Sequence, residues 1–222
     1  ALAEGVNIQF ANVNFKYADG TLALNNISFA IKRGQIFAIT GLSGSGKSSL
    51  LRLLTGAFKN YDGNILIDDV PIGNYSLSSL RSQTGILLSQ QDIFHGTLLE
   101  NICMGNKDVS LNEVGALANK LGMQSFIQQS ENGYDSILDP QGKRLTRKTR
   151  QGILLMRALL GKHRLLLLEE PFENLEKIEQ NALMRYLKND KSATIIIASN
   201  NQEFINQCDG VLYLKDGQLQ NQ

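Results

Sequence analysis

The stretch Gly41-Leu42-Ser43-Gly44-Ser45-Gly46-Lys47-Ser48 decides the fold of this chain. It lies between the apolar run of residues 35–40 and residues 49–54, in which leucines recur at helical spacing. A glycine-rich turn between a strand and a helix lets successive backbone N–H groups converge on an anion at the positive end of the helix. The order of these elements therefore predicts a phosphate-binding loop.

The residue types within the loop specify what it is expected to hold. The ammonium group of Lys47 is expected to reach the β- and γ-phosphates of a nucleotide, and the hydroxyl group of Ser48 to ligate Mg²⁺. A flexible Gly/Ser turn without a ligand is the alternative interpretation, which the flanking strand and helix disfavour. The candidate nucleotide-binding residues are Gly41, Ser43, Gly44, Ser45, Gly46, Lys47, Ser48 and Ser49.

Composition and charge argue against several other classes of protein. The formal net charge is +1, so nothing indicates nucleic acid or an anionic membrane surface as a partner. Cys103 and Cys208 lie far apart without metal-ligand spacing, which suggests reduced cytoplasmic thiols. No apolar run reaches about 18 residues, so no segment is predicted to span a bilayer. Residues 1–5 do not resemble a secretory signal, and a first residue other than Met suggests a piece of a longer polypeptide or a processed chain.

The rest of the chain alternates strands and helices. Before the loop, alternating apolar residues at 6–15 and 23–31 predict an early antiparallel sheet. From residue 97 to 128 the apolar residues recur at helical spacing, which predicts a mainly helical insertion without strands. This order is typical of an α/β fold with a mostly parallel core sheet. Further strands are predicted at 64–67, 85–88, 165–168 and 194–198, helices at 149–160 and 175–187, and a hairpin at 211–219.

The order of these motifs resembles that of the nucleotide-binding domain of ABC transporters over nearly the whole chain. The stretches Ser79-Leu80-Arg81, Phe94-His95-Gly96-Thr97 and Glu100-Asn101-Ile102 are similar to those of the exporter branch. The resemblance implies an α/β P-loop NTPase of ABC type in residues 1–222, with a mostly parallel core sheet, an N-terminal antiparallel β-subdomain and a helical subdomain at about residues 92–160. It also implies ATP and Mg²⁺ as ligands, with a second nucleotide-binding domain and a membrane-spanning domain of the same, longer chain as partners. The domain would then lie at the cytoplasmic face of a membrane.

The resemblance assigns roles to residues outside the loop. Tyr17 stands where the family stacks an aromatic ring on adenine, and a packing role at the end of a strand is its alternative. Gln90 matches the glutamine that reaches Mg²⁺ and the attacking water, with Gln91 as a rival in the next register. Glu169 stands where an Asp usually holds Mg²⁺ through water, and Glu170 where a Glu polarises the attacking water.

The signature segment, residues 145–149, departs from the family pattern LSGGQ. In the family this segment contacts ATP on the opposite subunit, and its glycines permit a close approach. Here Arg147 and Lys148 replace these glycines, and Thr146 keeps a hydroxyl group. The nearby basic residues either attract a triphosphate or form a solvated basic surface. The segment consists of Leu145, Thr146, Arg147, Lys148 and Thr149, and the basic residues around it are Lys143, Arg144 and Arg150.

Two more motifs differ from the family. The D-loop, SALD in the family, is Glu173-Asn174-Leu175-Glu176, and Asn200 replaces the switch histidine. An amide can donate a hydrogen bond to a γ-phosphate but carries no charge. The sequence therefore predicts that the chain binds Mg-ATP and dimerises to drive or gate export, with weak hydrolysis. A non-catalytic, nucleotide-gated half of a heterodimer and a soluble ABC ATPase without transport function are the alternatives.

Overall fold

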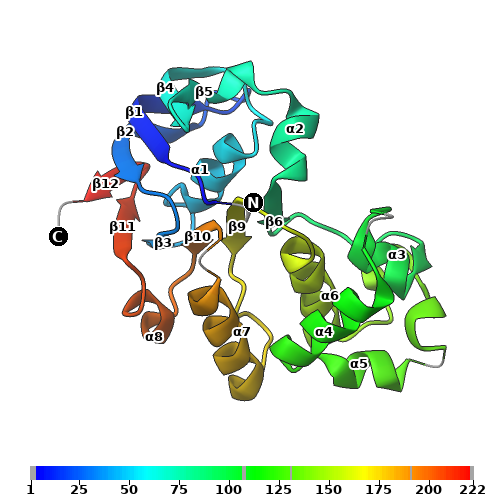
Figure 1. Ribbon diagram of the computed structural model, residues 1–222. Helices are drawn as coiled ribbons and strands as arrows, with labels where there is room; N and C mark the ends of the chain where they lie inside the picture. Colours follow the sequence, from blue (N-terminus) through cyan, green and yellow to red (C-terminus); the bar gives the residue numbers. More distant parts are fainter. Residues whose placement is uncertain (1–3, 107–108, 131, 191, 221–222) are drawn as a thin grey trace. The chain divides into compact units, whose positions relative to one another are not determined.

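The computed structural model describes residues 4–106, 109–130, 132–190 and 192–220, and these form two compact units (Figure 1). The first unit comprises the described residues of 1–84, 163–170 and 191–222. The second comprises those of 85–162 and 171–190. The phosphate-loop candidate lies in the first unit and the signature segment in the second.

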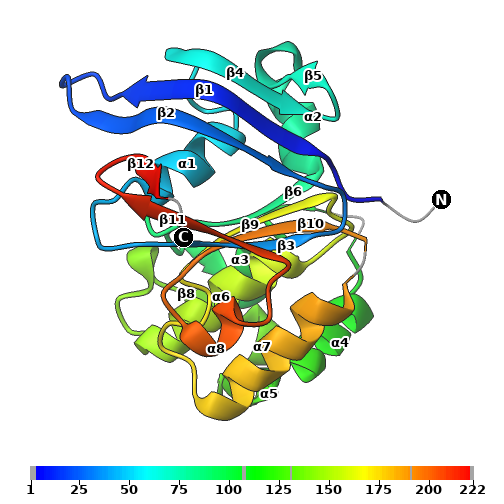
Figure 2. The ribbon, with the colours of Figure 1, turned by 90° about the vertical axis from the view of Figure 1, so that its left-hand side faces the viewer.

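A four-stranded antiparallel sheet occupies the N-terminal part of the first unit, with β1, β2 and β4 side by side (Figure 2). In β1 the side chains of Ile8, Phe10, Val13 and Phe15 are buried, as the alternation of apolar residues predicts. The predicted early antiparallel sheet is therefore confirmed. Its strands, in spatial order, are β2 (Leu22–Ile31), β1 (Ile8–Lys16), β4 (Tyr61–Ile67) and β5 (Val70–Pro71).

The central sheet has six strands in the order β12-β11-β3-β10-β9-β6, and β10 pairs in parallel with both β3 and β9. Its inner strands are buried on both faces, which is why they read as continuous apolar runs. The predicted α/β fold with a mostly parallel core sheet is confirmed. The strands are β3 (Ile36–Thr40), β6 (Thr84–Leu87), β9 (Leu165–Glu169), β10 (Thr194–Ala198), β11 (Gly210–Lys215) and β12 (Gln218–Gln220).

Helix α1 (Lys47–Leu54) follows the candidate loop directly and buries four leucines in the first unit. Two shorter helices of this unit are α2 (Leu77–Ser82) and α8 (Gln202–Ile205). The helices of the second unit are α3 (Leu98–Cys103), α4 (Leu111–Leu121), α5 (Gln124–Gln129), α6 (Arg147–Leu159) and α7 (Lys177–Asn189). Within the described residues, no helix combines the length and the apolar character needed to cross a membrane.

The prediction of an insertion without strands is wrong at its edge. Strand β7 (Gly96–Thr97) pairs with β8 (Ile137–Leu138). Strands of two residues are too short to show an alternation of apolar and polar side chains in the sequence. Thr97 also serves as the N-cap of α3, since its hydroxyl group accepts a hydrogen bond from the backbone of Glu100.

Several predicted boundaries shift because of capping and pairing. Helix α6 begins at Arg147 rather than residue 149, because the Thr146 hydroxyl caps it and accepts from the Thr149 N–H at 3.0 Å. Helix α7 begins at residue 177 rather than 175, behind a capping box of Glu176 and Glu179. Strand β4 begins at Tyr61 rather than residue 64, since Tyr61 pairs with β1.

Candidate functional site

The backbone around the candidate loop fixes the loop's shape. A Cβ atom on Gly41, at φ +148°, would lie 2.1 Å from the Leu214 carbonyl oxygen. A Cβ atom on Gly46, at φ +106°, would lie 2.7 Å from the Ala23 carbonyl oxygen. Real Cβ atoms do not approach backbone so closely, so both positions require glycine. The strands that carry these two carbonyl oxygens, β11 and β2, therefore leave no room for a side chain at Gly41 or Gly46.

Two polar side chains of the loop are available to a ligand, one because its hydrogen bonds can be replaced and one because it has none in the described part of the chain. The Lys47 ammonium donates to the carbonyl oxygens of Gly41 at 2.6 Å and Leu42 at 3.0 Å, so its charge lies over the loop. The buried Ser45 hydroxyl oxygen has no hydrogen-bond partner within the described part of the chain. A buried polar group without a partner costs free energy, and an anion seated in the loop could offer it one. The loop therefore fits a phosphate group.

Strand β9 and helix α1 bring the two candidate metal ligands of the first unit together. The Ser48 hydroxyl donates a short hydrogen bond to the Glu169 carboxylate. Hydroxyl and carboxylate oxygens are ligands that Mg²⁺ prefers. The glutamate that replaces the usual aspartate therefore reaches Ser48 with its longer side chain, and the pair fits a magnesium ion bound with a phosphate.

Glu170 follows Glu169 at the end of β9, in a backbone conformation that residues other than glycine rarely adopt. Its φ is +44°, and its N–H donates to the Ala198 carbonyl oxygen at 2.8 Å. The Ser199 hydroxyl donates to the Glu170 carboxylate at 3.1 Å. The last residue of β10 thus holds the backbone of Glu170, and Ser199, just after the strand, holds its carboxylate. No motif pointed to Ser199, because its role depends on the pairing of β9 with β10.

The side chain of Asn200, which follows β10 in the chain, lies beside Gly41, the first residue of the loop. Its amide oxygen accepts from the Thr40 hydroxyl at 2.7 Å and from the Gly41 N–H at 3.2 Å. Its amide nitrogen donates to the Gly41 carbonyl oxygen at 3.2 Å. The structure therefore brings Asn200 to the phosphate loop, with both ends of its amide bonded to Gly41 and its oxygen also bonded to Thr40 of β3.

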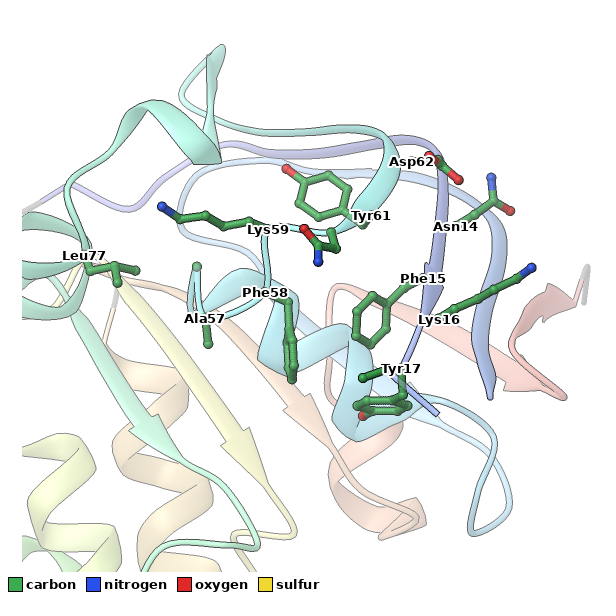
Figure 3. A pocket seen from close by; sticks show the side chains of 13 residues that line it. Asn14, Phe15, Lys16, Tyr17, Ala57, Phe58, Lys59, Tyr61, Asp62 and Leu77 are labelled. Carbon is green, nitrogen blue, oxygen red and sulfur yellow. The ribbon is translucent and has the colours of Figure 1, made fainter. Parts of the chain in front are cut away.

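Tyr17 borders a pocket of about 730 Å³ in the first unit. Figure 3 shows the rings of Phe15, Tyr17 and Phe58 close together at one side of this pocket. The rings of Tyr17 and Phe58 meet edge to face, with centroids 5.9 Å apart. The Tyr17 hydroxyl is 2.9 Å from the Ser49 hydroxyl, which joins the pocket wall to α1. None of the loop residues 41–48 lines this pocket, so it is the contact with Ser49 that places the Tyr17 ring near the loop, where an aromatic face suits a planar base.

The two candidate glutamines lie in the second unit and differ in their bonding. The Gln91 side-chain oxygen accepts from the Leu88 N–H at 3.3 Å, whereas Gln90 is exposed. Arg150 of α6 donates to the Gln91 carbonyl oxygen at 3.0 Å and forms a short ion pair with Asp92. The glutamine segment is therefore bonded to the helix that carries part of the signature segment.

Most cations near the signature segment are paired with acids of the same chain. Arg144 pairs with Asp139 at 3.0 Å. Lys148 pairs with Glu176 at 2.7 Å and with Glu179 at 3.0 Å, and these hydrogen bonds raise the pKa of the Lys148 ammonium above its ordinary value. Sequence reasoning missed Glu179, because a capping box usually begins with Ser or Thr and this one begins with Glu176.

Comparisons with known proteins agree with this geometry. A family model described as ABC transporter matches residues 24–173. The chain is 33% identical over 217 residues to the uncharacterized ABC transporter ATP-binding protein YfiC of Bacillus subtilis, covering 96% of this chain and 35% of that protein. It is 33% identical over 221 residues to the mitochondrial iron-sulfur clusters transporter atm1 of Aspergillus fumigatus, covering 98% of this chain and 30% of that protein.

A solved structure of a bacterial Atm1-family ABC exporter with ATP bound is similar in fold. Its TM-score is 0.90 at 29% identity, and the match covers 100% of this chain and 39% of that one. The chain thus spans about a third of the length of these relatives. With the family match extending over more than half of its residues, the chain belongs to the ABC transporter family, as a nucleotide-binding domain of the exporter type.

Proposed function

We propose that this domain binds Mg-ATP at residues 41–48 and pairs with a second nucleotide-binding domain to drive or gate export across a membrane. The observation that carries ATP binding is the glycine-dependent loop with the Lys47 ammonium over it and the buried Ser45 hydroxyl, which has no partner among the described residues. Export is supported by the description of the structural neighbour as an ABC exporter, and the proposed membrane-spanning domain on the same chain by the greater length of the relatives, of which this chain covers about a third. The domain would then work at the cytoplasmic face of the membrane.

The residues divide the work around the nucleotide as follows. The ring of Tyr17 packs on adenine, Lys47 neutralises the terminal phosphates, and Ser48 with Glu169 holds Mg²⁺. When bound, Mg²⁺ neutralises charge that develops on the phosphate oxygens. Glu170 accepts the hydrogen bond of the attacking water and polarises it. Gln90 is the glutamine-segment residue in this proposal, because the Gln91 side chain is bonded within its own segment.

Hydrolysis is proposed to be weak. Asn200 supplies no charge, and both ends of its amide are bonded to Gly41. Losing one well-placed stabilising donor lowers a rate by about 10²–10³. In the signature segment, Arg147 and Lys148 also replace residues without side chains, so close approach to a partner's nucleotide is obstructed.

A non-catalytic, nucleotide-gated half of a heterodimer is the second candidate. It is favoured by the presence of both departures, in the signature segment and at Asn200, in one chain, because a homodimer would carry both at each site. This candidate predicts that ATP stays bound without turnover and that a different ABC chain co-purifies.

A titration of the 222-residue chain with Mg-ATP tests the binding proposal. The Lys47→Ala variant is expected to lose tight binding, because no other loop cation replaces the ammonium. The matched control is Lys32→Ala, which removes an exposed lysine of the same unit and leaves affinity unchanged. Equal affinity in the Lys47→Ala variant would contradict the proposed site.

Turnover is the second measurement. The phosphate released per bound ATP separates a slow hydrolase from a domain that only binds. Release as fast as in a typical ABC ATPase would contradict the proposed weak hydrolysis while leaving the binding site intact.

A further inference from the structure

Two departures from the family motifs meet in the second unit. Lys148 stands where the signature segment has a glycine, and Glu176 where the D-loop has its aspartate. The Lys148 ammonium lies 2.7 Å from the Glu176 carboxylate and 3.0 Å from that of Glu179. The first turn of α6 is thus ionically bonded to the first turn of α7.

Of the three residues, Glu179 depends most on this ion pair, because it is the most buried. Its side chain is 5% exposed, whereas those of Lys148 and Glu176 are 39% and 68% exposed. Its second carboxylate oxygen accepts from the Glu176 N–H at 2.9 Å. A buried carboxylate is costly unless a cation or hydrogen bonds satisfy it. In the described ranges, the cation paired with Glu179 is Lys148.

We propose that Lys148 is a positioning residue that neutralises Glu179 and thereby fixes the signature segment to the N-terminus of α7. This inference rests on the proposed function of the signature segment as the part that meets a partner domain's nucleotide. While paired, Lys148 does not donate to that nucleotide. The exposed Arg147 is then the cation of the segment that faces outward.

The effect of replacing Lys148 is expected to depend on which residue stands at position 179. Replacing Lys148 alone by the family's glycine leaves the Glu179 charge buried without its cation. Replacing Glu179 by glutamine keeps an acceptor for the Glu176 N–H and removes the charge that needs Lys148. The two positions are therefore expected to depend on each other.

A double-mutant cycle by urea unfolding of the nucleotide-free chain tests this dependence. Lys148→Met is expected to lower the unfolding midpoint clearly, and addition of Glu179→Gln to recover much of the loss. Lys148→Arg should retain most of the wild-type midpoint, because an arginine also pairs with both carboxylates. The matched control, Lys143→Met, removes an exposed lysine before the segment and should leave the midpoint unchanged. Additive effects of Lys148→Met and Glu179→Gln would overturn the proposal.

Amide hydrogen exchange provides the readout for positioning. In Lys148→Met the amides of Thr149 and Arg150, which are hydrogen-bonded to Thr146, should exchange about tenfold or more faster, the factor that loss of one charged hydrogen bond corresponds to. Unchanged exchange there, or a rise spread evenly over the chain, would reduce Lys148 to a general stabilising contact and overturn its positioning role.

Both measurements need no nucleotide. Coupled positions in a chain that fails to bind Mg-ATP would contradict the proposed function alone, and uncoupled positions in a chain that binds it would contradict this inference alone.

Discussion

The phosphate loop and the signature segment of this domain have opposite states of bonding. In the loop, the buried Ser45 hydroxyl lacks a partner within the described residues, and Lys47 is bonded to carbonyl oxygens that a phosphate can replace. In the signature segment, Lys148 is bonded to carboxylates of its own chain. The first region has polar groups that a phosphate would bond, whereas the second pairs its Lys148 charge within the chain.

This difference shows that a positively charged segment binds an anion only when its charges are not already paired within the chain. A loop whose backbone is already restricted loses little conformational entropy when it binds a ligand. More of the free energy of its contacts then contributes to affinity. A cation that must leave a buried carboxylate to contact a ligand gains much less. Charge in a segment is therefore a poor guide to anion binding until its internal partners are known.

The largest effect is expected from Glu170→Gln, which tests whether the loop region also carries the chemistry. Loss of a general base lowers a rate by about 10²–10⁴. Mg-ATP affinity should persist, because the amide keeps the shape of the side chain. Phosphate release and an ATP titration measure the two properties, with the exposed Glu203→Gln as control. An unchanged rate would show that another group activates the water.

Gly41→Ala breaks the shape of the loop. The added Cβ atom would lie 2.1 Å from the Leu214 carbonyl oxygen. Overpacking and backbone strain together are expected to lower the free energy of unfolding by about 2–5 kcal/mol. Thermal or urea unfolding measures this. At Gly73 a Cβ atom would have no neighbour within 4 Å, so Gly73→Ala is the control, and equal losses would contradict a steric cause.

Substitutions of Tyr17 separate the ring from its hydroxyl group. Tyr17→Phe loses the hydrogen bond to Ser49, so the free energy of unfolding should fall by about 0.5–1.5 kcal/mol. The affinity for ATP should stay the same. Tyr17→Leu also loses the stacking ring, and affinity should fall by about 0.5–1.5 kcal/mol. Tyr75→Phe removes a comparable hydroxyl, bonded to the Ile67 carbonyl oxygen, and serves as control. Affinity lost already in Tyr17→Phe would point to the hydroxyl instead.

The smallest effect is expected from Arg144→Gln, on the signature side of the comparison. The Arg144 side chain is 89% exposed, and exposed ion pairs contribute about 0–1 kcal/mol. Unfolding measured at low and high salt should differ little from that of the wild-type chain. A loss as large as that of Lys148→Met would show that the surface cations, rather than the pair with Glu179, stabilise this region.

Local sequence patterns predicted the parts of the site that depend on neighbours in the chain. The strand, loop and helix around Lys47 were readable because their order and residue types are contiguous. The apolar run before Glu169 likewise identified a buried strand, since both faces of β9 are covered.

Contacts between distant segments could not be predicted in this way. The bonds from Asn200 to Gly41 depend on the parallel pairing of β10 with β3. The pairing of Lys148 with Glu179 depends on where the first turns of α6 and α7 meet, which no periodicity encodes. The choice between an anion-binding surface and a paired one therefore required the structure.

The unequal burial of the Lys148–Glu179 pair also sets the order in which the two residues can be replaced with least loss of stability. A half-exposed lysine is tolerable without a partner, whereas a buried carboxylate without a cation is not. Replacing Lys148 while Glu179 remains is therefore expected to destabilise the domain more than replacing Glu179 while Lys148 remains. An engineer who wishes to return this domain to the LSGGQ pattern would have to begin in α7, outside the motif to be repaired.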